Sequence, residues 1–166
     1  MIYAAGFGYY EIVKYLVSSG ANINIQNNDG YTGLISGTYS IIHTHTHSLT
    51  HSLTHSLVAC RYGHTDTVVF LLENQADVTI CNKYGYTALI CACFEGHLSL
   101  VKLLIQYHAY VDARNNYGNT GLMIACKNNH LDIVMYLHQQ SANIHLKNTH
   151  GDTCLTLACN EGIYTH

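Results

Sequence analysis

Histidines at a four-residue spacing are the side chains of this sequence whose type and pattern could do chemistry most directly. His43, His47, His51 and His55 would align on one face of a helix, and imidazole is a good ligand for zinc and copper. The surrounding residues are mostly Ser and Thr, which are weak helix formers. The chain has no Cys-x-x-Cys and no His-Glu-x-x-His sequence to complete a site. We therefore interpret the tract as a solvated low-complexity loop, keep a metal-binding tract as the alternative, and expect no metal ligand and no cofactor.

Four of the seven cysteines also recur regularly. Cys60, Cys93, Cys126 and Cys159 are equally spaced along the chain, and each follows an alanine. If the spacing reflects stacked units, equivalent points lie about 8–10 Å apart, whereas a disulfide needs α-carbons within about 7 Å. The pattern therefore predicts small buried hydrophobic residues in a reducing compartment, cytoplasmic or nuclear.

A catalytic arrangement is not recognisable among the remaining polar residues. His64, His97 and His130 each stand at the expected start of a helix, where a lone histidine is usually structural. No serine, cysteine or carboxylate has a base placed to activate it. We expect no catalytic residues and no enzymatic activity.

Composition narrows the classes of partner. Charged residues make up 10% of the 166 residues and the net charge is −3, which argues against nucleic-acid binding. No apolar run approaches the roughly 18–20 residues that span a bilayer, and the N-terminus lacks the basic start of a secretory signal. We expect neither a membrane nor a nucleic-acid partner.

The strongest pattern is an internal repeat with a constant period. Tyr84-Gly-Tyr-Thr87 returns as Tyr117-Gly-Asn-Thr120 and as His150-Gly-Asp-Thr153, and the step between successive threonines is the same each time. A constant period of this length, about 33 residues, indicates stacked supersecondary units that bury their apolar faces against one another.

The unit 82–114 shows the local plan. A turn around Gly85 precedes Thr87, whose hydroxyl can cap a helix over residues 88–95. Gly96 ends that helix and His97 begins a second one, in which positions 100, 101, 103 and 104 form an apolar stripe. Residues 111–114 then lead in extended form to the next turn.

These residues resemble the ankyrin repeat. In this unit the family pattern is matched by Thr87, Leu89, Ala92, Gly96, His97, Val101, Leu103, Leu104, Ala109 and Val111. The resemblance implies an all-α solenoid of stacked helix-turn-helix units with hairpin loops, interrupted here by one low-complexity insertion. We divide the chain into one array over 1–166, with a partial unit 1–26, a unit 27–81 with an insertion near 37–58, units 82–114 and 115–147, and a partial unit 148–166.

Two departures from the family pattern affect stability. Every copy lacks the proline and histidine of the family's Thr-Pro-Leu-His sequence, so apolar packing at Ile35, Ile90 and Met123 is expected instead. The glycine after the second helix survives only at Gly20, and Gln75, His108 and Ser141 replace it elsewhere. If those residues keep a left-handed backbone, each costs on the order of 1 kcal/mol relative to glycine.

The insertion splits the first helix of its unit. Thr32 and Thr87 are the equivalent threonines of successive units, but they are separated by one and two thirds periods instead of one. The extra two thirds of a period is the insertion. Alternating His-Thr is what a translated CA dinucleotide repeat encodes. The helix can be rebuilt from the downstream residues 54–60, or from the upstream residues 34–36 with the rest bulging out.

The resemblance implies binding of another protein or peptide segment through hairpin tips and the concave face of the first helices. Carried onto this chain, the expected protein-binding residues are Tyr31, Arg61, Tyr62, Lys83, Tyr84, Tyr86, Phe94, Glu95, Asn116, Tyr117, Asn119, Lys127 and Asn128. Tyrosine and arginine often carry interface energy. The alternative interpretation is that tyrosines in the turns only cover the hairpins.

Three functions remain open. The first is a non-catalytic protein–protein interaction scaffold, acting as a monomer or as part of a longer array. The second is the regulatory array of a larger signalling enzyme or channel, because both end units are partial and suggest a fragment. The third is a metal-binding protein acting through the histidine tract.

Overall fold

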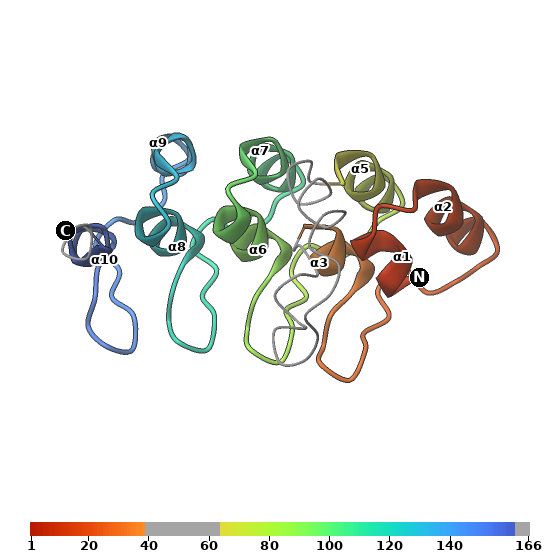
Figure 1. Cartoon of the computed structure of the whole chain (residues 1–166), viewed down its shortest axis with the longest axis horizontal. Coiled ribbons are helices and arrows are strands. Elements are labelled where there is room, and N and C mark those ends of the chain that lie inside the picture. The colour runs from red at the N-terminus through yellow and green to blue at the C-terminus, as the bar shows by residue number, and fades with distance from the viewer. Residues whose placement is uncertain (39–63, 162–166) are drawn as a thin grey trace, which may run out of the picture.

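The computed structural model describes residues 1–38 and 64–161, and these form two parallel layers of helices (Figure 1). One layer, which we call the inner layer, adjoins the hairpins and contains α1 (Ile2–Gly6), α3 (Gly33–Thr38), α6 (Ala88–Glu95), α8 (Gly121–Lys127) and α10 (Cys154–Glu161). The outer layer contains α2 (Tyr10–Ser18), α5 (Thr65–Glu73), α7 (Leu98–Gln106) and α9 (Leu131–Gln139). The predicted all-α repeat fold is confirmed.

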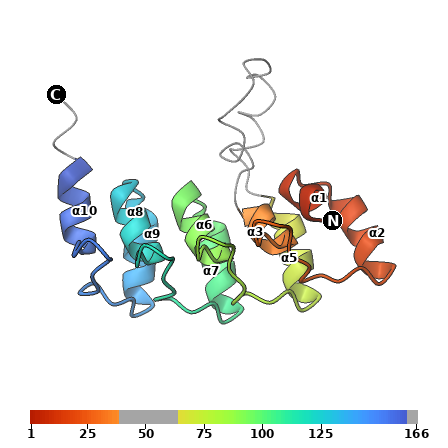
Figure 2. The same ribbon diagram turned by 90° about the horizontal axis from the view of Figure 1, so that it is seen from below.

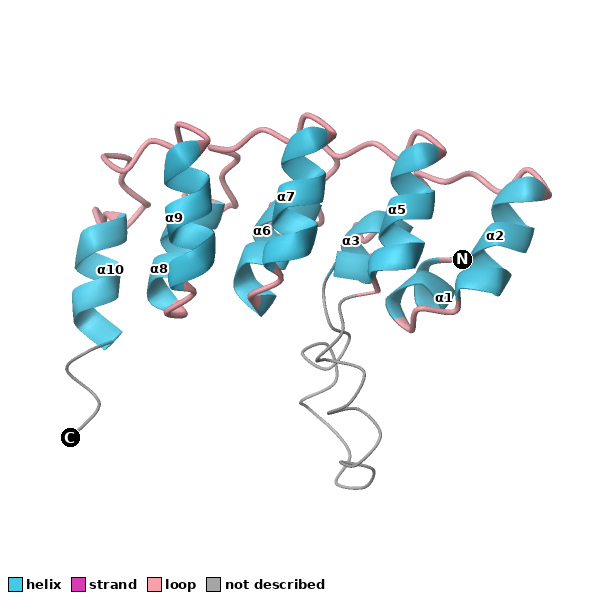
Figure 3. Ribbon diagram, turned by 90° about the horizontal axis from the view of Figure 1, so that it is seen from above, coloured by secondary structure: helices cyan, strands magenta, loops and turns pink. Residues whose placement is uncertain are grey.

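The layers arise because each helix pair stacks on the next along the chain. Figure 3 shows the pairs side by side in sequence order, with α2 at one end of the row and α10 at the other. Inner helices pack on inner neighbours, as α6 does on α8, and α1, α3, α6 and α8 each also pack on the outer helix of their own unit. Each unit therefore buries its apolar face against a neighbouring unit, as the repeats of solenoids generally do.

Threonine hydroxyls start the inner helices, as the sequence predicts for Thr87. The Oγ1 atom of Thr87 accepts a hydrogen bond from the Ile90 N–H at 3.3 Å, and that of Thr120 accepts one from the Met123 N–H at 3.2 Å. Thr32 caps α3 in the same way, with 3.2 Å to the Ile35 N–H. Each cap satisfies a backbone donor of the first turn that has no partner within the helix.

The helix ends store conformational strain where the sequence predicts it. After the outer helices, Gln75, His108 and Ser141 have φ values of +67°, +65° and +64°, beside +85° at Gly20. The left-handed backbone is thus kept at all four positions although only one is glycine. It is costly for residues with a Cβ, so the structure carries this penalty three times.

Upstream residues form the first helix of the interrupted unit. α3 begins at Gly33, directly after Thr32, and Leu34 and Ile35 are fully buried. It continues through Gly37 and Thr38, so the first two residues of the expected insertion are helical. The histidine tract and residues 54–60 lie outside the described residues.

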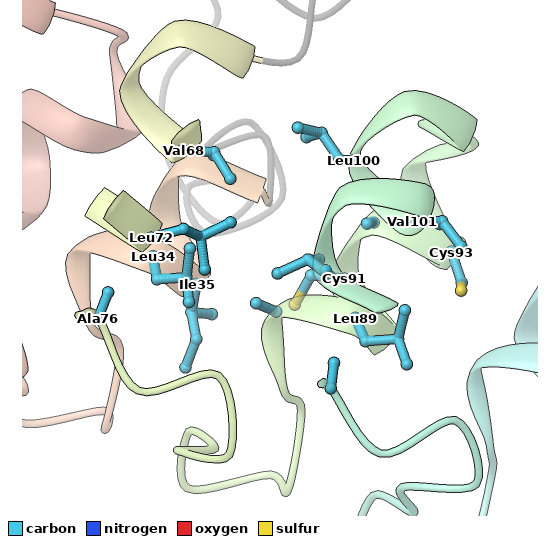
Figure 4. Close-up of a cluster of buried hydrophobic side chains, with 14 of the residues drawn as sticks. Leu34, Ile35, Val68, Leu72, Ala76, Leu89, Cys91, Cys93, Leu100 and Val101 are labelled. Carbon is cyan, nitrogen blue, oxygen red and sulfur yellow. The ribbon is translucent and has the colours of Figure 1, made fainter. Parts of the chain in front are cut away.

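Small and branched apolar side chains fill the space between the layers. Figure 4 shows Leu34, Ile35 and Leu72 facing Cys91 and Leu100 of the next unit, while Cys93 points to the other side of α6. All of these are buried. Ile35, Ile90 and Met123 are buried as well, which agrees with apolar packing in place of the family's histidine.

The sequence predicts that the four equally spaced cysteines are buried, and the structure bears this out only in part. Cys93 is completely buried, but Cys126 is half-buried and Cys159 is exposed. The prediction is wrong for Cys159 because α10 packs mainly against α8, which leaves the side of α10 that carries Cys159 in solvent. Cys60 lies outside the described residues.

Within residues 1–38 and 64–161, no helix has both the length and the apolar character needed to cross a membrane.

Candidate functional site

The tips of the hairpins are held by a repeated asparagine that the sequence analysis did not single out. The Oδ1 atom of Asn82 accepts hydrogen bonds from the Tyr84 and Tyr86 N–H groups, both at 3.0 Å. The same two bonds, to residues two and four positions on, recur at Asn27, Asn115 and Asn148. Three of these asparagines are buried, the exception being half-buried Asn27. The signal in the sequence is the recurrence of asparagine at one position of every hairpin.

Neighbouring hairpins are also bonded to one another through the backbone. The Asn116 N–H donates to the Tyr84 carbonyl at 3.0 Å, and the Thr149 N–H donates to the Tyr117 carbonyl at 3.0 Å. The Lys83 N–H makes the equivalent bond to the Asp29 carbonyl at 2.9 Å. Figure 2 shows the hairpins from below as a row of successive loops. The row is therefore a connected framework, in which the spacing of the tips is fixed by the backbone.

Two tyrosines project from adjacent tips of this framework. Tyr84 is 44% exposed and Tyr117 is 50% exposed, and they stand one period apart. The Lys83 ammonium lies 5.0 Å from the centre of the Tyr84 ring and forms an ion pair with Asp29. This arrangement joins an exposed aromatic surface to a cation.

Tyr31 and Tyr86 occupy a different position. Both are half-buried and pack against the hydrophobic core. The pKa of the Tyr31 hydroxyl is raised, mainly by burial. A hydrogen bond with the Asn82 side chain partly offsets the rise. Burial likewise raises the pKa of Tyr86, against a hydrogen bond with Asn115. Each ring fills the space between its own hairpin and the next, so its loss would affect folding as well as any contact.

Asn116 and Asn119 belong to the same tip. Asn116 is exposed, and its side-chain amide donates to the Lys83 carbonyl at 2.9 Å. Asn119 is half-buried, and its Oδ1 accepts from the Asn148 side chain at 2.9 Å. Both residues link successive hairpins, and Asn116 also presents polar surface beside Tyr117.

The expected residues of the inner helices lie at the C-terminal ends of α6 and α8. Phe94, Glu95 and Asn128 are half-buried, and Lys127 is exposed. The Asn128 amide donates to the Phe94 carbonyl at 2.9 Å, and the His130 ring contacts the same oxygen through Nε2 at 3.2 Å. Arg61 and Tyr62 lie outside the described residues.

The titratable groups nearby favour structural roles. Burial raises the pKa of the Cys91 and Cys93 thiols well above the usual value, so neither is a ready nucleophile. Burial lowers the pKa of His64 and His97, and the charges of His130 and His64 add to the effect at His97. No group of three or more His, Cys, Asp or Glu side chains in the described part of the chain is arranged to hold a metal ion.

Comparison with known families agrees with the fold and with the resemblance in the sequence. A family model described as ankyrin repeats (many copies) matches residues 1–40, 56–105 and 92–138. No curated protein sequence gives a match to the chain.

Proposed function

This chain belongs to the ankyrin-repeat family, whose members are generally protein–protein interaction modules, and on that premise we propose that it is a non-catalytic scaffold that binds an extended segment of another protein. The binding surface consists of the exposed hairpin tips and, further along the inner helices, the C-terminal ends of α6 and α8. Its working residues are Tyr84 and Tyr117, with Lys83 and Asn116 beside them and Lys127 at the far end of α8.

The observation that carries the proposal is the fixed pair of exposed tyrosines on bonded tips. A side chain that is already held in place loses less conformational freedom on binding, which increases affinity. Tyrosine supplies a large apolar contact together with a hydroxyl that can donate and accept hydrogen bonds. Backbone bonds between the hairpins fix the spacing of Tyr84 and Tyr117, and the Lys83 ammonium lies against the Tyr84 ring.

The rest of the set has supporting roles. Tyr31 and Tyr86 shape the floor between the tips. Phe94, Glu95, Asn119 and Asn128 are half-buried and contribute their outer edges. The free thiols of the described cysteines fit a reducing compartment, cytoplasmic or nuclear, for the proposed scaffold.

The test compares partner capture by the parent chain and by the double variant Tyr84→Ala/Tyr117→Ala. Proximity labelling in cells identifies the partners, and a titration with each purified candidate gives a Kd. We expect the double variant to weaken binding by at least about tenfold, because truncating a central aromatic anchor typically costs more than about 1 kcal/mol.

The matched control is Tyr15→Ala/Tyr110→Ala. These tyrosines are more exposed than the tip pair, at 72% and 68%, and Tyr15 lies on the outer helix α2. The control should retain every partner, and circular dichroism should show unchanged helix content in both variants. Equal binding by the folded double variant, or equal loss in the control, contradicts the proposed surface.

A further inference from the structure

Two cysteines of neighbouring units meet between α8 and α10. Cys126 lies in the last turn of α8 and Cys154 is the first residue of α10. The two helices pack together, both cysteines are half-buried, and both side chains lie against the hydrophobic core. Both thiols are free in the structure.

The repeat itself indicates the geometry of this pair. One period along the chain takes Cys93 to Cys126 and Gly121 to Cys154. A Cβ placed on Gly121 would lie 3.6 Å from the Cys93 Cβ. Cysteines joined by a disulfide have Cβ atoms about 3.5–4.5 Å apart. The equivalent positions 126 and 154 therefore have a backbone spacing that suits a disulfide.

Contacts of the two thiols support the same geometry. The Cys154 Sγ donates a hydrogen bond to the Ile144 carbonyl at 3.3 Å, which orients the side chain. Burial raises the pKa of Cys126 to about 11, and a hydrogen bond with the Cys154 thiol contributes to that rise. The two thiols therefore lie close enough for each to affect the other.

We propose that Cys126 and Cys154 form an oxidation site, at which a peroxide converts the two thiols into a disulfide that ties α10 to α8. Such a bond links the last described helix to the body of the array without touching the hairpin tips. In a reducing compartment the bond is transient, as intracellular disulfides with sensing roles usually are.

The reaction balances with one peroxide. Because the pKa of Cys126 is high, the first attack falls to the Cys154 thiolate, which bonds to one peroxide oxygen and becomes a sulfenic acid while the other oxygen leaves as water. The Cys126 sulfur then attacks the sulfenic sulfur, the S–O bond breaks, and a second water leaves. Two thiols lose two protons and two electrons, and hydrogen peroxide is reduced to two waters.

Other cysteines of the described chain are placed differently. Cys91 and Cys93 are fully buried and point to opposite sides of α6 (Figure 4). Cys81 and Cys159 are exposed, and Cys81, which stays in every variant below, serves as the internal reporter that the oxidant has reached the protein.

The experiment uses the full chain with Cys159→Ser. This substitution leaves Cys154 as the single cysteine of the tryptic fragment 148–166. Cleavage after Arg114, Lys127 and Lys147 gives the fragments 115–127 and 148–166, which carry Cys126 and Cys154. After treatment with hydrogen peroxide and alkylation of the remaining thiols, mass spectrometry should find these fragments joined and lighter by two hydrogens. Hydrogen exchange in α10 should slow by roughly tenfold or more, because the bond opposes local opening.

The matched variant adds Cys154→Ala to Cys159→Ser. Alanine is the native residue at the equivalent position Ala88, so the helix start should be preserved. This variant should show neither the joined fragments nor the slower exchange. Full alkylation of Cys126 and Cys154 in the parent, while Cys81 is oxidised, would overturn the proposal. Joined fragments found only in a disulfide-linked dimer would overturn it too.

Discussion

Gly85 approaches the backbone of Asn116 so closely that a Cβ on Gly85 would lie 2.7 Å from the Asn116 nitrogen. Gly85 also has φ of +79°, a left-handed conformation. We expect Gly85→Ala to lower the free energy of unfolding by about 2–4 kcal/mol, because backbone strain and a clash between hairpins add together. Urea denaturation followed by circular dichroism measures the loss.

Gly151 provides the matched control because it stands at the same place two periods later. Its φ is +86°, but a Cβ there would meet no atom within 4 Å. Gly151→Ala should therefore cost only about 1 kcal/mol, the conformational part alone. Similar losses for the two variants would show that the contact between hairpins has no energetic weight.

The asparagines that hold the tips give a second prediction. Asn115→Ala removes the acceptor of the Tyr117 and Asn119 N–H groups, which bond to its Oδ1 at 3.0 Å. Leaving two donors without a partner should cost about 2–3 kcal/mol. The neighbouring substitution Asn116→Ala, at an exposed residue with one side-chain bond to the Lys83 carbonyl, should cost about 0.5–1 kcal/mol. Thermal unfolding of both variants tests the difference, and an equal loss would contradict the role of Asn115.

The fold could be predicted from the sequence because its signals are local and repeated. The Thr87 cap, the helix over 88–95 and the glycine end at Gly96 each follow from residue type, and the structure has α6 at those residues. The left-handed residues at 75, 108 and 141 followed from register alone. The periodicity predicts the fold because each contact recurs in several repeats.

The tip surface could be predicted only in outline. Residue type places Tyr84 and Tyr86 together, two positions apart, but one ring is exposed and the other packs on the core. That difference depends on which face of the hairpin meets the next unit. The sequence of one repeat does not reveal which face this is. The pairing of Cys126 with Cys154 across α8 and α10 was missed for a related reason. It joins two different register positions of neighbouring units, whereas the sequence analysis compared equivalent positions.

Strain at the ends of the outer helices gives a third prediction. His108 has φ of +65° and is exposed. His108→Gly should raise the free energy of unfolding by about 1 kcal/mol, because glycine adopts this backbone without a Cβ penalty. His108→Ala keeps the Cβ and should leave stability nearly unchanged. A gain of the same size in both variants would assign the effect to the lost imidazole instead of the backbone.

Acid sensitivity gives the last prediction, from the half-buried imidazoles of His64 and His97. Burial is the main cause that lowers the pKa of each below its ordinary value of 6.5, and a hydrogen bond with the Gly6 backbone partly opposes it at His64. In the interval between the folded and unfolded pKa values the unfolded chain binds more protons, so stability rises with pH there. The contribution is fully present above about pH 7 and is lost as the pH falls through about 6.5 toward the folded values.

Urea midpoints measured between about pH 7.5 and pH 5 should therefore fall on acidification, and His97→Gln should make the fall shallower. Asp77 tests the assignment because hydrogen bonds from Thr79 lower its pKa below the ordinary 3.8. Its contribution is lost only in a separate, more acidic interval. A fall of equal steepness over the histidine interval in the parent and in His97→Gln would show that the His97 imidazole does not carry the effect.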